Sequence, residues 1–326
     1  MHKLSALLFC LIAGHAIART APPSAPKRVQ TAQRVTFDFH SAFLMNLHHF
    51  LYDMAVRKDK LASVQWQAAP TSDEMDTLRN AIAFYRSHYA ELELLDDATM
   101  VGIKHALSVD DARRSTAGLA LPPGLAAVLD SVAPIYERSL WSLHDRSNRT
   151  WIAQARALDT VFGAEVQANI ERHLGAPFPT RPIRDDVVFA TGTRQGAYTD
   201  EQIVMPSNRA DYQGLAALEM LYHEASHTTV TVALEAAIEA RLKATGRKDD
   251  LALWHVAQFY TVGKVTQDVL AKRGISYRSY ADQRGLYAGF WAPLMPVLEA
   301  VWVPHMDGKL NLQDTVNLMV DRLPAP

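Results

Sequence analysis

The chain has 326 residues, of which 48% are hydrophobic, and its formal net charge is −2. This is the composition of a globular protein, and the near-neutral charge argues against a nucleic-acid partner, which requires a basic face to neutralise phosphates. Beyond residue 20, no stretch is apolar for the roughly 20 residues of a membrane-spanning helix, so we expect no membrane span.

The first 18 residues have the features of a cleaved export signal. A short basic start precedes an apolar run, and small residues follow at Ala16 and Ala18. This arrangement is typical of a secretory signal peptide cut after Ala18. Residues 19–34 are rich in proline, alanine and basic residues and are predicted to be a flexible leader. We therefore expect a secreted or periplasmic protein in which residues 35–326 form a single domain.

The only cysteine, Cys10, lies inside this signal segment. The exported protein would therefore contain neither a disulfide nor a thiolate metal site. Any metal would have to be held by histidine, aspartate or glutamate, and this ligand set suits zinc in an exported hydrolase.

The N-terminal half, up to about residue 175, has the periodicity of helices. We predict a first helix from Val35 to about Arg57. Further helices are predicted over residues 72–95, 124–144 and 149–174. The polar segment "WSLHDRSNRTW", residues 141–151, is predicted to be a surface turn between the last two helices.

Three histidines lie in the first predicted helix. His40 and His48 would share one helical stripe, two turns apart. We interpret His48 and His49 as core histidines bonded to the backbone or to a carboxylate such as Asp53, and a role in the cleft stays open as the alternative.

Over residues 175–208 the helical periodicity is lost, because prolines interrupt it. The segments "DVVFAT" and "EQIVMP" are predicted short strands, with Gly192 and Gly196 in the turn between them. Helices are then predicted over about residues 210–244, 249–272, 285–301 and 311–323. The expected fold class is mainly α, with a small β element directly before the helix that begins near residue 210.

This helix carries the sequence HEASH at residues 223–227. His223 and His227 are four residues apart, so both lie on one helix face and can direct a ring nitrogen at one zinc ion. Glu224 is rotated about 100° from His223, so it can reach a zinc-bound water without ligating the metal. Zinc lowers the pKa of its water to about 7, and a neighbouring carboxylate completes the deprotonation. We therefore predict that His223 and His227 are zinc ligands and that Glu224 is the catalytic base. The helix itself would be capped by Asn208 or Asp211.

Residues 180–230 resemble the active-site region of the zincin metallopeptidases, and specifically an exported bacterial branch of them. In that family H-E-x-x-H lies on a helix preceded by a short sheet. The resemblance implies a zincin-like α+β fold with His223 and His227 as ligands and Glu224 as the general base. It also implies that an edge strand lines the cleft and pairs with an extended substrate, for which "EQIVMPS" and "GAYT" are the candidates.

A catalytic zinc needs a third protein ligand, which the motif does not supply. The metzincin pattern H-E-x-x-H-x-x-G-x-x-H is excluded, because Val230 and Ala233 occupy its glycine and third-histidine positions. The E-x-x-x-D pattern of gluzincins is not found downstream. The candidates are Glu235, Glu239, His255 and Asp268.

The residues after HEASH decide among these candidates. If one straight helix ran to Lys243 and returned as a hairpin, Asp268 would lie closest to His227. However, "TTVTV", residues 228–232, is a run of five β-branched residues, which makes a poor helix interior. A break there would let His255, the stronger zinc ligand type, return to the metal. We predict His255 as the third ligand, and the other three candidates stay open.

The expected function is an exported zinc-dependent hydrolase, a metallopeptidase acting on a peptide or protein substrate. One alternative is a non-catalytic, exported helical metal-binding protein, and another is a zinc hydrolase of non-peptide amides. The sequence does not determine cleavage specificity or oligomeric state. It also leaves open which tyrosine would stabilise the oxyanion. The tyrosines considered are Tyr198, Tyr260, Tyr277, Tyr280 and Tyr287.

Overall fold

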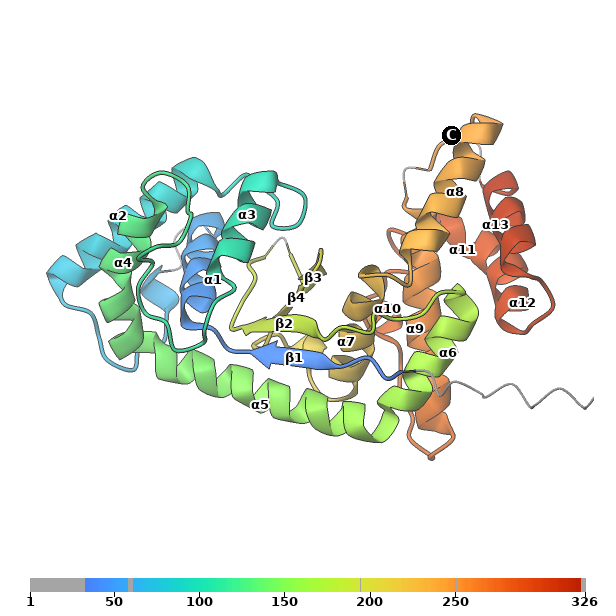
Figure 1. Cartoon of the computed structure of the whole chain (residues 1–326), viewed down its shortest axis with the longest axis horizontal. Helices are drawn as coiled ribbons and strands as arrows, with labels where there is room; N and C mark the ends of the chain where they lie inside the picture. Colours follow the sequence, from blue (N-terminus) through green and yellow to red (C-terminus); the bar gives the residue numbers. More distant parts are fainter. Residues whose placement is uncertain (1–32, 58–60, 194, 250, 324–326) are drawn as a thin grey trace, which may run out of the picture. The chain divides into compact units, whose positions relative to one another are not determined.

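The computed structural model describes residues 33–57, 61–193, 195–249 and 251–323, which are mainly helical with one small sheet (Figure 1). The predicted signal peptide, and the predicted leader up to residue 32, lie outside the described residues. Gln33–Pro326 form one compact unit. Among the described helices, none combines the length and the hydropathy needed to cross a bilayer.

The sheet has four strands in the order β1-β2-β4-β3. They are β1 (Phe37–His40), β2 (Ile183–Val188), β3 (Tyr198–Thr199) and β4 (Ile203–Pro206). Strands β1, β2 and β4 are parallel, whereas β3 is antiparallel to β4. Asp185, Ile203 and Thr199 are in register across the sheet, so they share one face, and Tyr198 points to the other.

An apolar core lies on each face of the sheet. The first core is formed with α1 (Phe43–Val56), α2 (Ser72–His88), α3 (Ala98–Leu107) and α4 (Leu125–Tyr136). The second is formed chiefly with α5 (Ser142–Leu158), α6 (Ala164–Leu174), α7 (Leu215–His227) and α9 (Leu253–Ala271). Helix α8 (Val232–Thr245) packs against α13 (Leu312–Asp321). The remaining short elements are η1 (Leu61–Ser63), η4 (Ala210–Tyr212), α10 (Tyr280–Gln283), η5 (Ala292–Leu294), α11 (Met295–Val297), η6 (Leu298–Trp302) and α12 (Val303–Met306).

The first predicted helix is wrong at its start. Phe37–His40 form strand β1, and α1 begins only at Phe43, so His40 shares no helical stripe with His48. Pairing with β2, which is distant in sequence, overrides the local helical pattern. The helix predicted over residues 72–95 ends at His88, and α3 was not predicted. The helix predicted over 285–301 is a series of short turns.

The predicted surface turn at residues 141–151 is also wrong. Helices α4, α5 and α6 form one helical run, joined by the π-helical turns η2 (Glu137–Trp141) and η3 (Asp159–Gly163). His144, Asn148 and Trp151 are buried and recur at helical spacing, while the charged residues between them face outward. The polar composition of the segment concealed this period. Figure 1 shows α5 running alongside β1 and β2.

The β element differs from the prediction in its pairing. The strands in "DVVFAT" and "EQIVMP" are parallel neighbours, and β3 lies between them along the chain. The segment "EQIVMPS" is therefore internal to the sheet and cannot be its edge strand. The segment "GAYT", in contrast, contains the edge strand β3.

The region predicted as one helix over residues 210–244 is divided into η4, α7 and α8. Helix α7 follows Gly214, whose φ of 59° is in the left-handed region, and no side chain caps it, so capping by Asn208 or Asp211 was wrong. Helix α7 ends at His227, where the β-branched run begins. The chain turns there, and α9 comes to lie against α7.

Candidate metal centre

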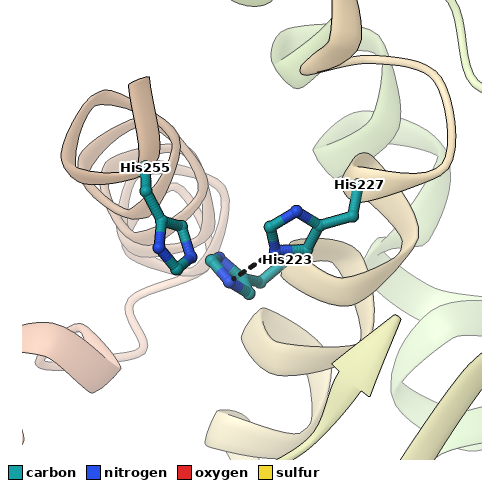
Figure 2. Close-up of side chains that lie close together, drawn as sticks. All are labelled: His223, His227 and His255. Atoms are coloured by element: carbon teal, nitrogen blue, oxygen red, sulfur yellow. Dashed lines mark hydrogen bonds between the residues drawn. The ribbon is translucent and has the colours of Figure 1, made fainter. Parts of the chain in front are cut away.

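Three histidines from two helices meet in the second core (Figure 2). His223 and His227 lie on α7, and His255 lies in the first turn of α9. One potential ligand atom from each ring lies within 4.8 Å of the others. The Nε2 atoms of His223 and His227 are 3.3 Å apart. Among the described residues, this is the only group of three or more side chains so placed.

The spacing of His223 and His227 fits two ligands of a tetrahedral metal ion. Zinc binds histidine nitrogens at about 2.0–2.1 Å, which places two of its ligands about 3.3 Å apart. The Nε2 atom of His255 is buried and has no hydrogen-bond partner in the part of the chain that the structure describes, and the same holds for Nδ1 of His223. Buried polar atoms normally have a partner, and a cation coordinated by Nε2 of His255 would supply one.

Burial keeps all three imidazoles neutral. Desolvation, followed by repulsion from neighbouring rings, lowers the pKa of His223 well below its usual value and that of His227 to about 3. Desolvation lowers the pKa of His255 to about 4. A neutral imidazole has a free lone pair, so each ring is in the form that ligates metals.

Aromatic and polar contacts fix the orientation of these rings. Phe259 lies over His223 with 3.8 Å between ring centroids, and Trp254 stacks on His255 at 4.8 Å. The Gln258 amide donates to the His223 carbonyl and to Ser226 Oγ, which links α9 to α7. The ligand geometry is therefore held by packing and hydrogen bonds between the two helices.

Glu224 is buried next to the triad, with 4% of its surface exposed. The Thr199 hydroxyl, from edge strand β3, donates to Glu224 Oε2 at 2.7 Å. Desolvation raises the pKa of Glu224 to about 7, and the Thr199 hydrogen bond opposes this shift. A carboxyl group with this pKa can both accept and return a proton near neutral pH.

The other candidate ligands lie outside the cluster. Glu239 is exposed, and Glu235 is half-buried in the first turn of α8. Asp268 pairs with Lys264 on an exposed part of α9. It is 13 residues from His255 along the same helix, a separation of roughly 20 Å.

The N-terminal histidines are engaged elsewhere. His40 contacts Asp111 and Asp38. Nδ1 of His48 is 2.9 Å from the Tyr85 hydroxyl, and His49 contacts the Met45 carbonyl and, at 2.9 Å, the Tyr198 hydroxyl. His48 and His49 are buried as interpreted from the sequence, but their partners are tyrosines and backbone.

The tyrosines left open for the oxyanion have varied surroundings. The Tyr198 hydroxyl contacts His49 on the face of the sheet opposite Thr199, so it does not face the triad. Tyr280 donates from its hydroxyl to Asp211 at 3.3 Å. Tyr260, Tyr277 and Tyr287 are half-buried around α9, and nothing in their contacts selects one of them.

Sequence reasoning missed Thr199, Gln258 and Glu219. The Glu219 carboxylate is buried one turn before His223, where it accepts from the backbone N–H of Tyr280. Desolvation raises the pKa of Glu219 to about 7. Its position four residues before His223 was a usable signal, whereas Thr199 and Gln258 are identified only by the packing of β3 and α9 against α7.

No protein-family model matches this chain, and no curated protein and no solved structure matches it either. The function is therefore argued from the arrangement of its own residues.

Proposed function

We propose that this chain is an exported zinc-dependent hydrolase of the zincin type that cleaves peptide bonds. The observation that carries the proposal is a buried carboxylate, Glu224, which directly follows His223 on the helix that supplies two of the three clustered histidines. A protein that only binds metal needs the histidines. It does not need a carboxylate buried nearby, because burying that group costs free energy. A catalytic base accounts for both features.

His223, His227 and His255 would hold the ion. Three imidazoles suit zinc, and three protein ligands leave the fourth position of a catalytic site open. When bound, zinc acts as a Lewis acid toward the substrate carbonyl and toward water. The aromatic rings of Phe259 and Trp254 exclude bulk water from the ligand side of the site.

Glu224 would move the proton. Its Oε2 accepts from Thr199, and its Oε1 has no hydrogen-bond partner among the described residues. Oε1 takes a proton from the attacking water, whose oxygen bonds to the carbonyl carbon. Oε1 of Glu224 then returns the proton to the leaving nitrogen as the C–N bond breaks. Thr199 keeps the carboxylate in one orientation through both steps.

The sheet favours a peptide over other amides. Strand β3 pairs with β4 on one side and has no strand partner on the other among the described residues. An extended peptide can add to such an edge through main-chain hydrogen bonds. Because Thr199 belongs to this edge, a peptide bound there would lie beside Glu224. Export follows from the signal pattern in residues 1–18 and belongs to the same proposal.

The test compares wild type with Glu224→Gln, and with Glu235→Gln as a matched control at a half-buried glutamate outside the cluster. We expect Glu224→Gln to retain stoichiometric zinc and to lower peptide hydrolysis by about 10²–10⁴-fold, because a general base is lost. Metal analysis and a fluorogenic peptide library measure the two properties. Full hydrolysis by Glu224→Gln would refute the mechanism. Zinc-loaded wild type that cleaves no peptide would favour the metal-binding alternative.

A further inference from the structure

A cavity lies on the α1 side of the sheet and shares no residue with the metal centre. Its volume is about 250 Å³. It is bounded by α1, by residues 63–65, by the start of α5, and by the segments that directly follow β2 and β4. In sheets with parallel strands, ligands bind outside the carboxyl ends of the strands, which is where Phe189 and Asn208 lie. Leu140, from the π-helical turn η2, adds to the wall, and such turns are frequent at functional sites.

Arg57 supplies hydrogen-bond donors at this cavity. Its Nε lies 2.6 Å from Asp53 Oδ1, an ion pair that holds the guanidinium near the Asp53 carboxylate. The two terminal nitrogens of Arg57 have no hydrogen bond or ion pair with any described residue, and the side chain is 27% exposed. The open end of a guanidinium binds a carboxylate through two parallel hydrogen bonds.

His144 supplies a further donor. Its Nδ1 is 2.8 Å from the hydroxyl of Tyr136, a residue buried so deeply that desolvation raises its pKa well above the usual value. The Tyr136 hydroxyl therefore keeps its proton. Among the described residues, Nδ1 of His144 is its only acceptor, so Nδ1 accepts this hydrogen bond. Burial lowers the pKa of His144 to about 3, which leaves one ring hydrogen, on Nε2. Nε2 has no partner among the described residues, and His144 lines the cavity.

The rest of the wall is mostly apolar. Phe189 stacks on His144, with 3.9 Å between ring centroids and planes 4° apart. Phe50, Met54 and Leu143 continue the apolar surface. Because a cavity of about 150 Å³ holds benzene, about 250 Å³ has room for a ring, a short chain and a small head group.

We infer that this cavity binds a small organic carboxylate with an apolar or aromatic tail. The carboxylate accepts hydrogen bonds from the end of the Arg57 guanidinium and from His144 Nε2, and the tail packs against Phe50, Met54 and Phe189. An ammonium head group is repelled by Arg57, and the Asp53 carboxylate that also lines the cavity is already paired with Arg57. An amide keeps the tail contacts but loses the charge pairing with Arg57.

The test is isothermal titration of the full chain with 3-phenylpropionate, 3-phenylpropionamide and 3-phenylpropylamine, which share a tail and differ in head group. We expect the acid to bind at least tenfold more tightly than the amide, and the amine not to bind. Arg57→Gln should weaken the acid at least tenfold and leave the amide unchanged. Arg79→Gln is the matched control, because Arg79 also pairs with an aspartate, Asp76, but lies outside this cavity.

Leu143→Trp is a second variant, which fills the cavity without altering the ion pair and should abolish binding of the acid. Thermal melting confirms that each variant folds. Equal affinity for acid and amide, or acid binding that is unaffected by both Arg57→Gln and Leu143→Trp, would overturn the inference. So would wild type that binds none of the three probes. The measurement involves neither zinc nor hydrolysis, so its outcome is independent of the proposed peptidase activity.

Discussion

Two pairs of histidines in this protein have almost the same geometry and very different surroundings. The rings of His48 and His49 are 5.1 Å apart at 87°, and those of His223 and His227 are 5.0 Å apart at 83°. Burial lowers the pKa of all four imidazoles. Ring geometry and charge state therefore do not distinguish the pairs.

Hydrogen bonding does distinguish them. Both nitrogens of His49 have partners, the Met45 carbonyl and the Tyr198 hydroxyl. Nδ1 of His223 has no partner within the described ranges, and Nε2 of His223 lies 3.3 Å from Nε2 of His227. Neither His48 nor His49 contributes a buried nitrogen without a partner among the described residues. Buried histidines with satisfied nitrogens stabilise a core, whereas unsatisfied nitrogens aimed at one point mark a site for a cation.

The largest expected effect comes from exchanging one histidine of each kind for alanine. Under the proposed function, wild type should retain one zinc through dialysis and His255→Ala should lose it, because two ligands do not make a catalytic zinc site. His49→Ala should retain zinc and lose about 1–3 kcal/mol of unfolding free energy, because it leaves buried partners unsatisfied. Metal analysis and urea denaturation measure the two outcomes. If His49→Ala lost the metal and His255→Ala kept it, the comparison would be reversed.

A smaller effect is expected at Thr199, the only hydrogen-bond partner of Glu224 among the described residues. Thr199→Val should lower kcat by about 10–100-fold with zinc content unchanged, as is typical when a group that orients a site residue is removed. Thr199→Ser should restore most of the rate, because it keeps the hydroxyl. Thr191→Val is the matched control, since the Thr191 hydroxyl bonds to the Gln195 carbonyl. A rate unchanged in Thr199→Val would show that Glu224 needs no support from the edge strand.

The third test asks whether the comparison extends to a buried group outside the histidine triad, the carboxylate of Asp185. Both carboxylate oxygens of Asp185 are buried and have no hydrogen-bond partner among the residues that the structure describes, and desolvation raises the pKa of Asp185 well above the usual value. At pH values above the pKa of Asp185 in the unfolded chain and below its pKa in the folded protein, only the folded state keeps the carboxyl proton. The free energy of unfolding therefore falls progressively as pH rises through this range. Asp185→Asn should be more stable than wild type at pH 7, by a margin that grows by up to about 1.4 kcal/mol per pH unit.

Urea denaturation of Asp185→Asn and wild type at pH 5, 7 and 8.5 measures this margin. A gap that does not widen with pH would mean that Asp185 is ionised in the folded protein and that it has a partner. Unsatisfied buried atoms would then be a weaker marker of a binding site than the histidine comparison suggests.

The parts of the fold that the sequence predicted are those encoded locally. The α7 helix follows from its own apolar period, although it was predicted as part of one longer helix over about 210–244, and the break that the β-branched residues 228–232 allowed is where α7 ends. Because that end turns the chain, it also placed His255 within reach of the other two histidines. The role of His255 as a metal ligand stays a prediction.

The parts that the sequence did not predict depend on distant partners. Strand β1 forms because Phe37–His40 pair with β2, and the short apolar–polar alternation of these four residues was hidden by the helical period that continues into α1. The parallel register of β2 and β4 and the contact of Thr199 with Glu224 are likewise set by packing across the sheet. In residues 141–151, a helical period was present but was masked by polar side chains whose outward orientation only the fold defines.

The pairing of β1 with β2 also has a consequence for the order of folding. His223 and His255 are 32 positions apart, whereas Phe37 and its partner Ile183 are 146 apart. By loop-closure entropy, the longer loop costs about 1.3 kcal/mol more to close. Contacts between α7 and α9 therefore have the lower contact order, and low-order contacts form faster. This favours an order of folding in which the three histidines come together early and β1 joins the sheet late.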